Sequence, residues 1–239
     1  MMTSSLRALN RVRCMSTAAA NLRDPVIGVI SGSARSGSFN TTLAKAAGKM
    51  AEAKGATTML INLGFDYALP LYSQDLEVDF PAAAVELKAK LASCDAWIIA
   101  GPEYNGFATP LLVNAITWSS RGDPPGEMYA TFKGKTAAVI ATSPGGLGGM
   151  RALNSYKELL MNLGTTCLPL SVAVGGAMKA FKEDGSLADS KMAGMLDGLI
   201  TQLVHVARSE ANREVACEIL STLKKAATAG EYGAVTAAT

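Results

Sequence analysis

Five continuous apolar runs alternate with helical patterns between about residue 25 and residue 210, and this alternation restricts the choice of fold. The runs are apolar throughout and do not alternate with polar residues, which is typical of strands in a parallel sheet covered on both faces. We predict strands at residues 25–31, 57–62, 96–101, 136–142 and 167–174.

The segments between these runs carry helical signals. Leu43, Ala47 and Met50 recur at a spacing of three or four residues, so they share one helix face, and Gly55 is placed to end that helix. We predict helices near residues 40–54, 81–93, 110–120 and 149–163, then a long helix at 189–208 and a further one at 212–226. Strands and helices that alternate in this way predict an α/β fold with a doubly wound parallel sheet.

Length and composition exclude several classes of protein. The 239 residues are enough for one well-cored domain. The net charge of +2 gives no reason to expect a nucleic-acid partner, and no apolar run reaches the ~20 residues of a membrane-spanning helix. The four cysteines are widely spaced without a C-x-x-C pair, so no metal site is expected, and a reducing compartment fits best.

The N-terminal segment differs in composition from the rest. Residues 1–23 carry four arginines, no acidic residue and many Ser, Thr and Ala residues, which is the composition of an organellar transit peptide. The alternatives are an N-terminal extension without a targeting role, or translation that starts at Met15. We expect residues 1–24 to be a transit peptide or a disordered extension, 25–210 the functional domain, and 211–239 a C-terminal helix with a disordered tail. The protein would be mitochondrial or in another organelle if residues 1–24 are a transit peptide, and cytoplasmic otherwise.

Three unusual loops follow the first, third and fourth predicted strands. Doubly wound sheets bind ligands at the carboxyl ends of their strands, so these loops are the candidate site. The first loop, SGSARSGSFN at 31–40, places small hydroxyl residues and Arg35 before a helix N-terminus, where free N–H groups and the helix dipole attract a phosphate. Its glycines, Gly32 and Gly37, do not match a dinucleotide fingerprint, and Ser38 stands where a Walker A loop has Lys. A terminal monophosphate fits better, and an ordinary Ser/Gly turn remains the alternative.

The second and third loops are weaker signals when each is taken alone. The second, GPEYNG at 101–106, is a rigid turn in which Tyr104 offers a stacking face and Asn105 an amide. The third, SPGGLGG at 143–149, has four glycines, which favour a close backbone approach. Plain structural turns are the alternative for both.

Acid–base machinery is missing from the sequence. The one histidine, His205, lies on a polar helix face, and no G-x-S-x-G elbow occurs. Hydride transfer through a bound cofactor needs no strong protein acid or base, so the sequence favours redox chemistry.

Five segments together resemble the NAD(P)H-dependent FMN reductases, a flavodoxin-like family that includes quinone, chromate and azo-dye reductases. The matching segments are GSxRxxSFN at 32–40, LPLYxQD at 69–75, PEYNG at 102–106, TPxLxNAIxW at 109–118 and SPGGxGG at 143–149. The resemblance covers about residues 26–208. It implies a five-stranded sheet of order 2-1-3-4-5 with helices on both faces.

The resemblance also implies a cofactor, a reaction and a set of site residues. FMN would be bound, NADPH or NADH would be the co-substrate, and a quinone or a similar small molecule would accept the electrons. The phosphate of FMN would be held by Ser33, Arg35, Ser38, Phe39 and Asn40. The isoalloxazine edge would meet Pro102, Glu103, Tyr104 and Asn105, and its other side Ser143, Gly146 and Gly148. Family members are usually homodimers or homotetramers.

The sequence departs from the family pattern at two positions. Val113 and Thr117 stand where the family often has Lys and Asp, which puts oligomer contacts in doubt more than FMN binding.

Other functions remain as alternatives. A non-enzymatic flavodoxin-type electron carrier, or a flavin-binding signalling protein, is the alternative to an enzyme. A degenerate ATP or GTP loop at 32–38 is disfavoured because the lysine is absent.

Overall fold

The computed structural model describes residues 22–122 and 128–228. The predicted N-terminal extension falls outside these ranges except for its last residues, and so does the predicted C-terminal tail from residue 229 onward.

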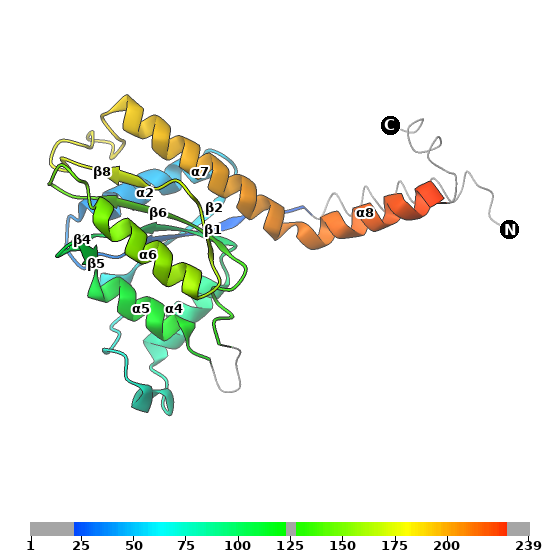
Figure 1. The fold of residues 1–239 in the computed structure, drawn as a ribbon, viewed down its shortest axis with the longest axis horizontal. Coiled ribbons are helices and arrows are strands. Elements are labelled where there is room, and N and C mark those ends of the chain that lie inside the picture. The colour runs from blue at the N-terminus through cyan, green and yellow to red at the C-terminus, as the bar shows by residue number, and fades with distance from the viewer. Residues whose placement is uncertain (1–21, 123–127, 229–239) are drawn as a thin grey trace. The chain divides into compact units, whose positions relative to one another are not determined.

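A parallel sheet forms the centre of the fold (Figure 1). Its strands are β1 Val26–Ser31, β2 Thr57–Asn62, β3 Ala96–Ala100, β6 Thr136–Thr142, β7 Thr166–Cys167 and β8 Val172–Val174. Their order is β2-β1-β3-β6-β7, with β8 also pairing with β6, and every pair is parallel. The predicted flavodoxin-like order is confirmed, with β7 and β8 together standing for the fifth strand.

The fifth strand differs from the prediction because it is broken. Thr136 pairs with Thr166, whereas Ile140 pairs with Val172, so the edge strand has two more residues than its partner between these points. Pro169 lies inside the break. Proline has no N–H to donate to a ladder, which is tolerated at a sheet edge or a bulge and not in a central strand.

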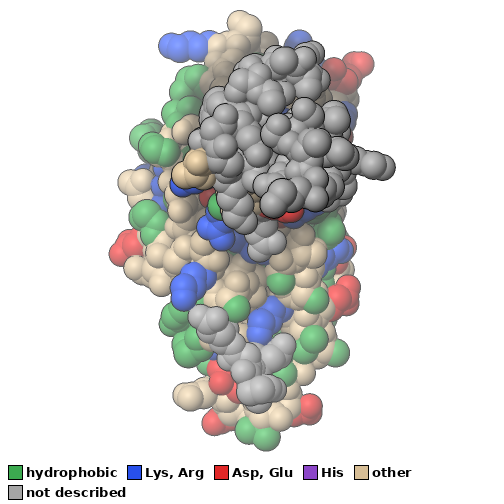
Figure 2. All heavy atoms as spheres, turned by 90° about the vertical axis from the view of Figure 1, so that its right-hand side faces the viewer, with side chains coloured by type: hydrophobic (Ala, Val, Ile, Leu, Met, Phe, Trp, Pro, Cys, Tyr) green, Lys and Arg blue, Asp and Glu red, His purple; other side chains and the backbone are tan. Residues whose placement is uncertain are grey.

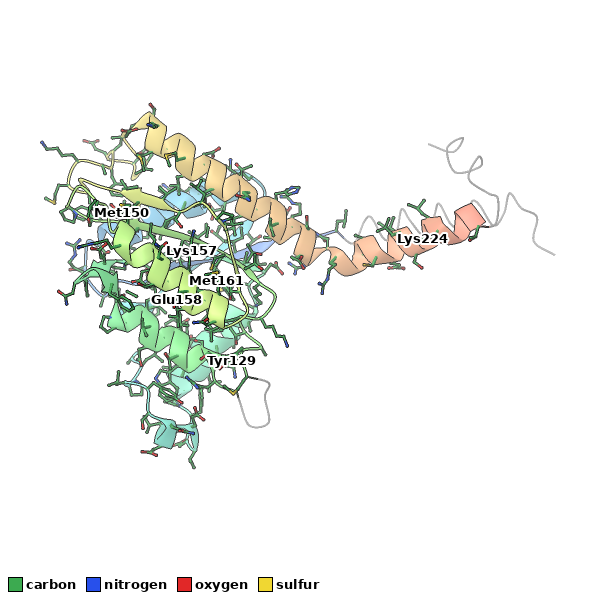
Figure 3. All side chains as sticks on the ribbon, viewed as in Figure 1. Tyr129, Met150, Lys157, Glu158, Met161 and Lys224 are labelled. Atoms are coloured by element: carbon green, nitrogen blue, oxygen red, sulfur yellow. The ribbon has the colours of Figure 1, made fainter. Side chains whose placement is uncertain are left out.

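Helices cover both faces of the sheet (Figure 1). The longer ones match the predicted helices closely and are α2 Phe39–Glu52, α4 Ala82–Ala92, α5 Pro110–Ser120, α6 Met150–Asn162 and α7 Ser190–Ala211. Short elements were not predicted, namely α3 Leu63–Asp66, the 3-10 turn η1 Gln74–Glu77, and the strands β4 Glu103–Tyr104 and β5 Phe107–Ala108. Figure 3 shows Lys157, Glu158 and Met161 on α6.

Residues of the central strands β1, β3 and β6 pack into two separate cores, one on each face of the sheet. In β1, Ile27 and Val29 pack with α2 and α7, whereas Ile30 packs with α4, α5 and α6. Trp97 of β3 is fully buried in the core that contains Ile30. It packs so closely on Gly28 that a Cβ added to this glycine would lie 2.7 Å from Cδ1 of Trp97. The two cores fix the sheet between its helix layers, so the loops at the carboxyl edge stand on a rigid base.

The chain divides into two compact units. Residues 25–207 hold the sheet and its helices, and the second unit combines residues 1–24 with 208–239. In the described part of the second unit, α8 Arg213–Thr228 follows Asn212, whose amide bonds the backbone N–H of Arg23 at 2.9 Å and its carbonyl at 3.0 Å.

The surface carries a mixture of side chains. Figure 2 shows basic, acidic and hydrophobic side chains interspersed on the described part of one face. Among the described residues, no helix has both the length and the apolar character that crossing a membrane requires.

Candidate functional site

The three predicted loops meet at one cavity of about 270 Å³ at the carboxyl edge of the sheet. The cavity is lined by residues from all three loops and by one residue from the segment after β8: Ser33, Arg35, Ser38, Phe39, Asn40, Pro102, Glu103, Tyr104, Thr142, Ser143, Pro144 and Met178. Nine of the twelve residues predicted for the site are among them. Asn105, Gly146 and Gly148 are not.

The first loop forms a cradle at the N-terminus of α2. Ser38 is the N-cap residue, and its hydroxyl accepts the N–H of Thr41 at 3.4 Å. Within the described ranges, the N–H groups of Phe39 and Asn40 donate to no protein acceptor. Free N–H groups at a helix N-terminus, beside buried serine hydroxyls at 33 and 38, make an anion-binding site.

Arg35 stands at the rim of this cradle. Its guanidinium carbon lies 5.1 Å from the ring centroid of Phe39, whose ring in turn lies parallel to that of Phe181 at 6.4 Å. No ion pair joins Arg35 to a carboxylate in the described chain. The positive charge is therefore available to an anion in the cavity.

Asn40 connects the first loop to the third. Its Nδ2 donates to the carbonyl of Thr142 at 2.8 Å, and its Oδ1 accepts the N–H of Thr142 at 3.0 Å. Both ends of the amide are thus occupied by the last residue of β6, whereas the backbone N–H of Asn40 has no protein acceptor in the described ranges.

The second loop is a tight hairpin. Strands β4 and β5 are joined by Asn105 and Gly106, whose φ angles are 55° and 78°. Two consecutive residues with positive φ are the requirement of a type I′ turn, for which Asn-Gly is a preferred pair. Asn105 therefore lies at the hairpin tip, and Tyr104, which is 53% exposed, lies beside the cavity.

Glu103 is held by the first turn of α6. Its carboxylate accepts the backbone N–H of Arg151 at 3.0 Å and Nε of the same residue at 2.7 Å, and it forms a further short contact with the other guanidinium nitrogen. The hydrogen bonds from Arg151 lower the pKa of Glu103 below its ordinary value. The carboxylate stays ionised, and the guanidinium of Arg151 balances its negative charge. It therefore does not oppose an anion in the cavity.

Tyr156 of α6 fixes both ends of the second loop. Its buried hydroxyl donates to the carbonyl of Pro102 at 2.7 Å and accepts the N–H of Thr109 at 2.8 Å. The ring lies so close to Gly101 that an added Cβ would be 2.2 Å from one of its carbons. Burial raises the pKa of Tyr156, so the hydroxyl keeps its proton.

Glycines of the third loop serve packing as well as turning. Gly148 and Gly149 have φ angles of 62° and 87°, and a Cβ at Gly148 would lie 2.6 Å from the carbonyl carbon of Val174. The carbonyl oxygen of Gly146 would lie 2.4 Å from a Cβ at Gly175. The loop thus packs backbone against backbone on residues 174–175.

Two further motif segments hold each other outside the cavity. The amide of Asn114 accepts the N–H of Tyr72 at 2.8 Å and donates to the carbonyl of Pro70 at 2.9 Å. The indole of Trp118 donates to the same carbonyl at 2.8 Å. These bonds hold the segments 69–75 and 109–118 against each other.

Sequence reasoning missed three residues that line the cavity. Thr142 and Pro144 are the sequence neighbours of the predicted residue Ser143, and this adjacency could have identified them as lining residues. Met178, which is 73% exposed, comes from the segment after β8 and carries no signal in the sequence.

The cavity contains no free acid or base. Glu103 is its one carboxylate and is paired with Arg151, and none of its lining residues is a histidine. In the described part of the chain, no group of His, Cys, Asp and Glu residues could hold a metal ion. Redox chemistry carried by a bound cofactor suits such a cavity.

Comparison with known proteins identifies the family. Residues 25–179 match the family model described as NADPH-dependent FMN reductase. The chain belongs to this family. It is 36% identical over 168 residues to an NAD(P)H-dependent FMN reductase of Pseudomonas aeruginosa, a match that covers 68% of this chain and 84% of the relative. A quinone reductase of Pseudomonas putida is 32% identical over 165 residues, with the same coverage of 68% and 84%.

A solved structure supports the same assignment. The flavoenzyme NAD(P)H:(acceptor) oxidoreductase FerB of Paracoccus denitrificans is similar with a TM-score of 0.67 and 32% identity. The match covers 78% of this chain and 98% of FerB.

The cavity fits FMN, the cofactor of this family. FMN has a terminal monophosphate and a flat polar ring system. The free N–H groups at the start of α2, the serine hydroxyls and Arg35 suit the phosphate. Tyr104 and Pro102 offer flat surfaces for the ring.

Proposed function

We propose that the protein is an FMN-dependent NAD(P)H oxidoreductase that reduces quinones or related small acceptors. The meeting of three loops at one cavity is the observation that carries the proposal, because phosphate-binding and ring-binding groups then belong to a single ligand. Chromate, azo compounds and free flavin are further candidate acceptors.

Each loop has a proposed role in binding FMN. Residues Ser33, Arg35, Ser38 and Phe39, with the backbone of Asn40, would hold the phosphate. Pro102, Glu103, Tyr104 and Asn105 would meet the ring through their backbone groups and the Tyr104 side chain. Ser143, Gly146 and Gly148 would shape the opposite wall.

FMN, when bound, supplies the hydride-accepting chemistry. The protein contributes position and electrostatics instead of proton transfer, because Glu103 is tied to Arg151 and Tyr156 keeps its proton inside the fold. Tyr104 and Met178, both largely exposed at the cavity, would form the surface over which the nicotinamide and then the acceptor pass.

Cofactor content and turnover test this function. The purified protein should be yellow with flavin absorbance, or should become so with added FMN, and should oxidise NADPH or NADH with a quinone acceptor. Protein that binds no FMN would contradict the whole proposal. FMN binding without steady-state turnover would instead support a flavodoxin-type carrier.

We also propose an assembly and a location. The family resemblance favours a homodimer or homotetramer, which light scattering of the purified protein would test. If residues 1–24 are a transit peptide, they would direct the protein to mitochondria or another organelle, and otherwise the protein would be cytoplasmic. The domain at 25–210 would carry the function, with 211–239 as a C-terminal helix and tail. A fluorescent protein fused behind residues 1–24 that stayed in the cytoplasm would contradict the targeting role.

A further inference from the structure

Two more hollows continue from the FMN cavity along α2. The nearer one, of about 260 Å³, shares Arg35 and Ser38 with that cavity and extends to Thr42 and Lys45. The farther one, of about 360 Å³, shares Thr42 and Lys45 with the nearer and extends to Lys49. We call these two hollows the α2 groove. Helix geometry gives it a length of roughly 16 Å from Ser38 to Lys49.

The α2 groove is positively charged. Lys45 and Lys49 are four residues apart, so they lie on the same helix face, where like charges repel and cost stability unless an anion joins them. No carboxylate in the described chain forms an ion pair with Lys45. Lys54, on the next turn, contrasts with it because its ammonium lies 2.7 Å from Asp197.

The single carboxylate lining the groove is already engaged. Oδ1 of Asp184 accepts the N–H of Ser186 at 2.9 Å and its hydroxyl at 2.6 Å. Lys49 donates to the carbonyl of Asp184 at 3.4 Å. Asp184 therefore braces a turn, and its pKa is lowered chiefly by the hydrogen bonds from Ser186 and also by the charges of Lys182 and Lys49. With Arg35, Lys45 and Lys49 against this one carboxylate, the lining of the groove keeps a net positive charge.

The groove also has features that suit a nucleoside. Ala46, Met50 and Ala53 form an apolar wall in the farther hollow. In the nearer hollow, the hydroxyl of Thr41 hydrogen-bonds that of Ser31 at 2.7 Å, and the hydroxyl of Thr42 donates to the carbonyl of Ser38 at 3.3 Å. Each of these threonine oxygens can still accept a hydrogen bond from a ligand hydroxyl.

We propose that the α2 groove binds the adenosine 2′-phosphate end of NADPH, with Lys45 and Lys49 on the phosphate. This inference rests on the proposed function, since a nicotinamide at the flavin ring requires the rest of the dinucleotide to leave the cavity along a surface. The α2 groove meets the cavity at Arg35 and Ser38, so the dinucleotide would pass the proposed FMN phosphate before it reaches the lysines. The groove then offers cations for phosphates and an apolar wall for adenine. The protein then prefers NADPH to NADH, because only NADPH has the 2′-phosphate.

Binding of 2′,5′-ADP to the FMN-loaded protein tests the site without turnover. The double variant Lys45→Ala, Lys49→Ala should weaken 2′,5′-ADP about tenfold or more, as expected for loss of charge-assisted hydrogen bonds, and 5′-AMP much less. Lys88→Ala on α4, which packs on the opposite face of the sheet, removes the same charge and should have no effect. Steady-state kinetics should show the KM ratio of NADPH to NADH rising by a similar factor.

Several results would overturn the proposal. Unchanged 2′,5′-ADP affinity in the double variant is one. Equal weakening of 2′,5′-ADP and 5′-AMP is another, and a parallel loss of FMN would assign the lysines to the FMN phosphate instead. A wild-type protein that binds 2′,5′-ADP through these lysines but oxidises neither nucleotide would keep the site and refute the proposed function alone.

Discussion

Asn40 and Thr142 form a closed pair of hydrogen bonds, with side-chain amide against backbone amide at 2.8 and 3.0 Å. Asn40 lies at the start of α2 and Thr142 at the end of β6, and both are buried. The pair fixes the first and third loops to each other, so the width of the proposed FMN site depends on it.

Removal of the Asn40 amide should loosen the site. Asn40→Ala leaves the buried N–H and C=O of Thr142 without partners, which should cost about 2–4 kcal/mol of unfolding free energy. FMN affinity should fall as well. Urea unfolding and fluorescence titration with FMN measure the two effects. Stability within about 0.5 kcal/mol of wild type would show that the pair contributes little.

Arg35→Ala should weaken FMN binding by about 1.5–3 kcal/mol, as expected for one charge-assisted bond to a phosphate. Arg35→Lys is the matched control and should recover part of the loss, because it keeps the charge but not the planar guanidinium. An unchanged FMN dissociation constant in Arg35→Ala would remove Arg35 from the site.

Tyr156→Phe tests whether α6 positions the second loop. Phenylalanine preserves the packing on Gly101 but leaves the N–H of Thr109 and the carbonyl of Pro102 without the hydroxyl. We expect a loss of about 1–3 kcal/mol in unfolding free energy and weaker FMN binding. If FMN affinity stayed at the wild-type value while stability fell, Tyr156 would serve the fold alone.

The pair of Glu103 and Arg151 should make stability depend on pH. The pKa of Glu103 is lowered in the folded protein, so the carboxylate stabilises the fold at neutral pH, and this contribution disappears as the pH falls through the folded-state pKa. The stability gap between wild type and Glu103→Gln should therefore be widest at neutral pH and shrink in acid. A gap that stays constant from neutral pH down to about pH 3 would contradict the ion pair's role.

Two glycine substitutions should change stability in opposite directions. Gly28→Ala places a methyl group 2.7 Å from Cδ1 of the fully buried Trp97, so overpacking should cost about 1–3 kcal/mol. Gly194→Ala on α7 meets nothing within 4 Å and should stabilise the helix by up to about 1 kcal/mol. Thermal unfolding of both variants checks the contrast, and a stable Gly28→Ala would mean that Trp97 can move.

Long elements were predictable from sequence because each carries many residues of one pattern. The strands at Thr57–Asn62 and Thr136–Thr142 and the helix at Pro110–Ser120 match their predicted bounds. Short elements depend on distant partners instead. The chain around Pro70 is held by Asn114 and Trp118, and no local pattern near residue 70 reports that contact.

The candidate site shows the same division. The first and third loops were predicted to meet because each follows the carboxyl end of a parallel strand. That argument did not reveal that the Asn40 amide faces Thr142 or that Gly148 packs on Val174. Met178 was missed because its approach to the cavity depends on the path of the chain after the broken fifth strand.

That break has a consequence for how the molecule behaves in a crowded solution. An unbroken edge strand presents a row of unpaired N–H and C=O groups on which another chain can add, the first step of aggregation. Here the edge is reduced to β7 Thr166–Cys167 and β8 Val172–Val174, out of register with each other and separated by a segment containing Pro169. The break between β7 and β8, which the sequence did not predict, thus protects this edge of the sheet against pairing with a strand of another chain.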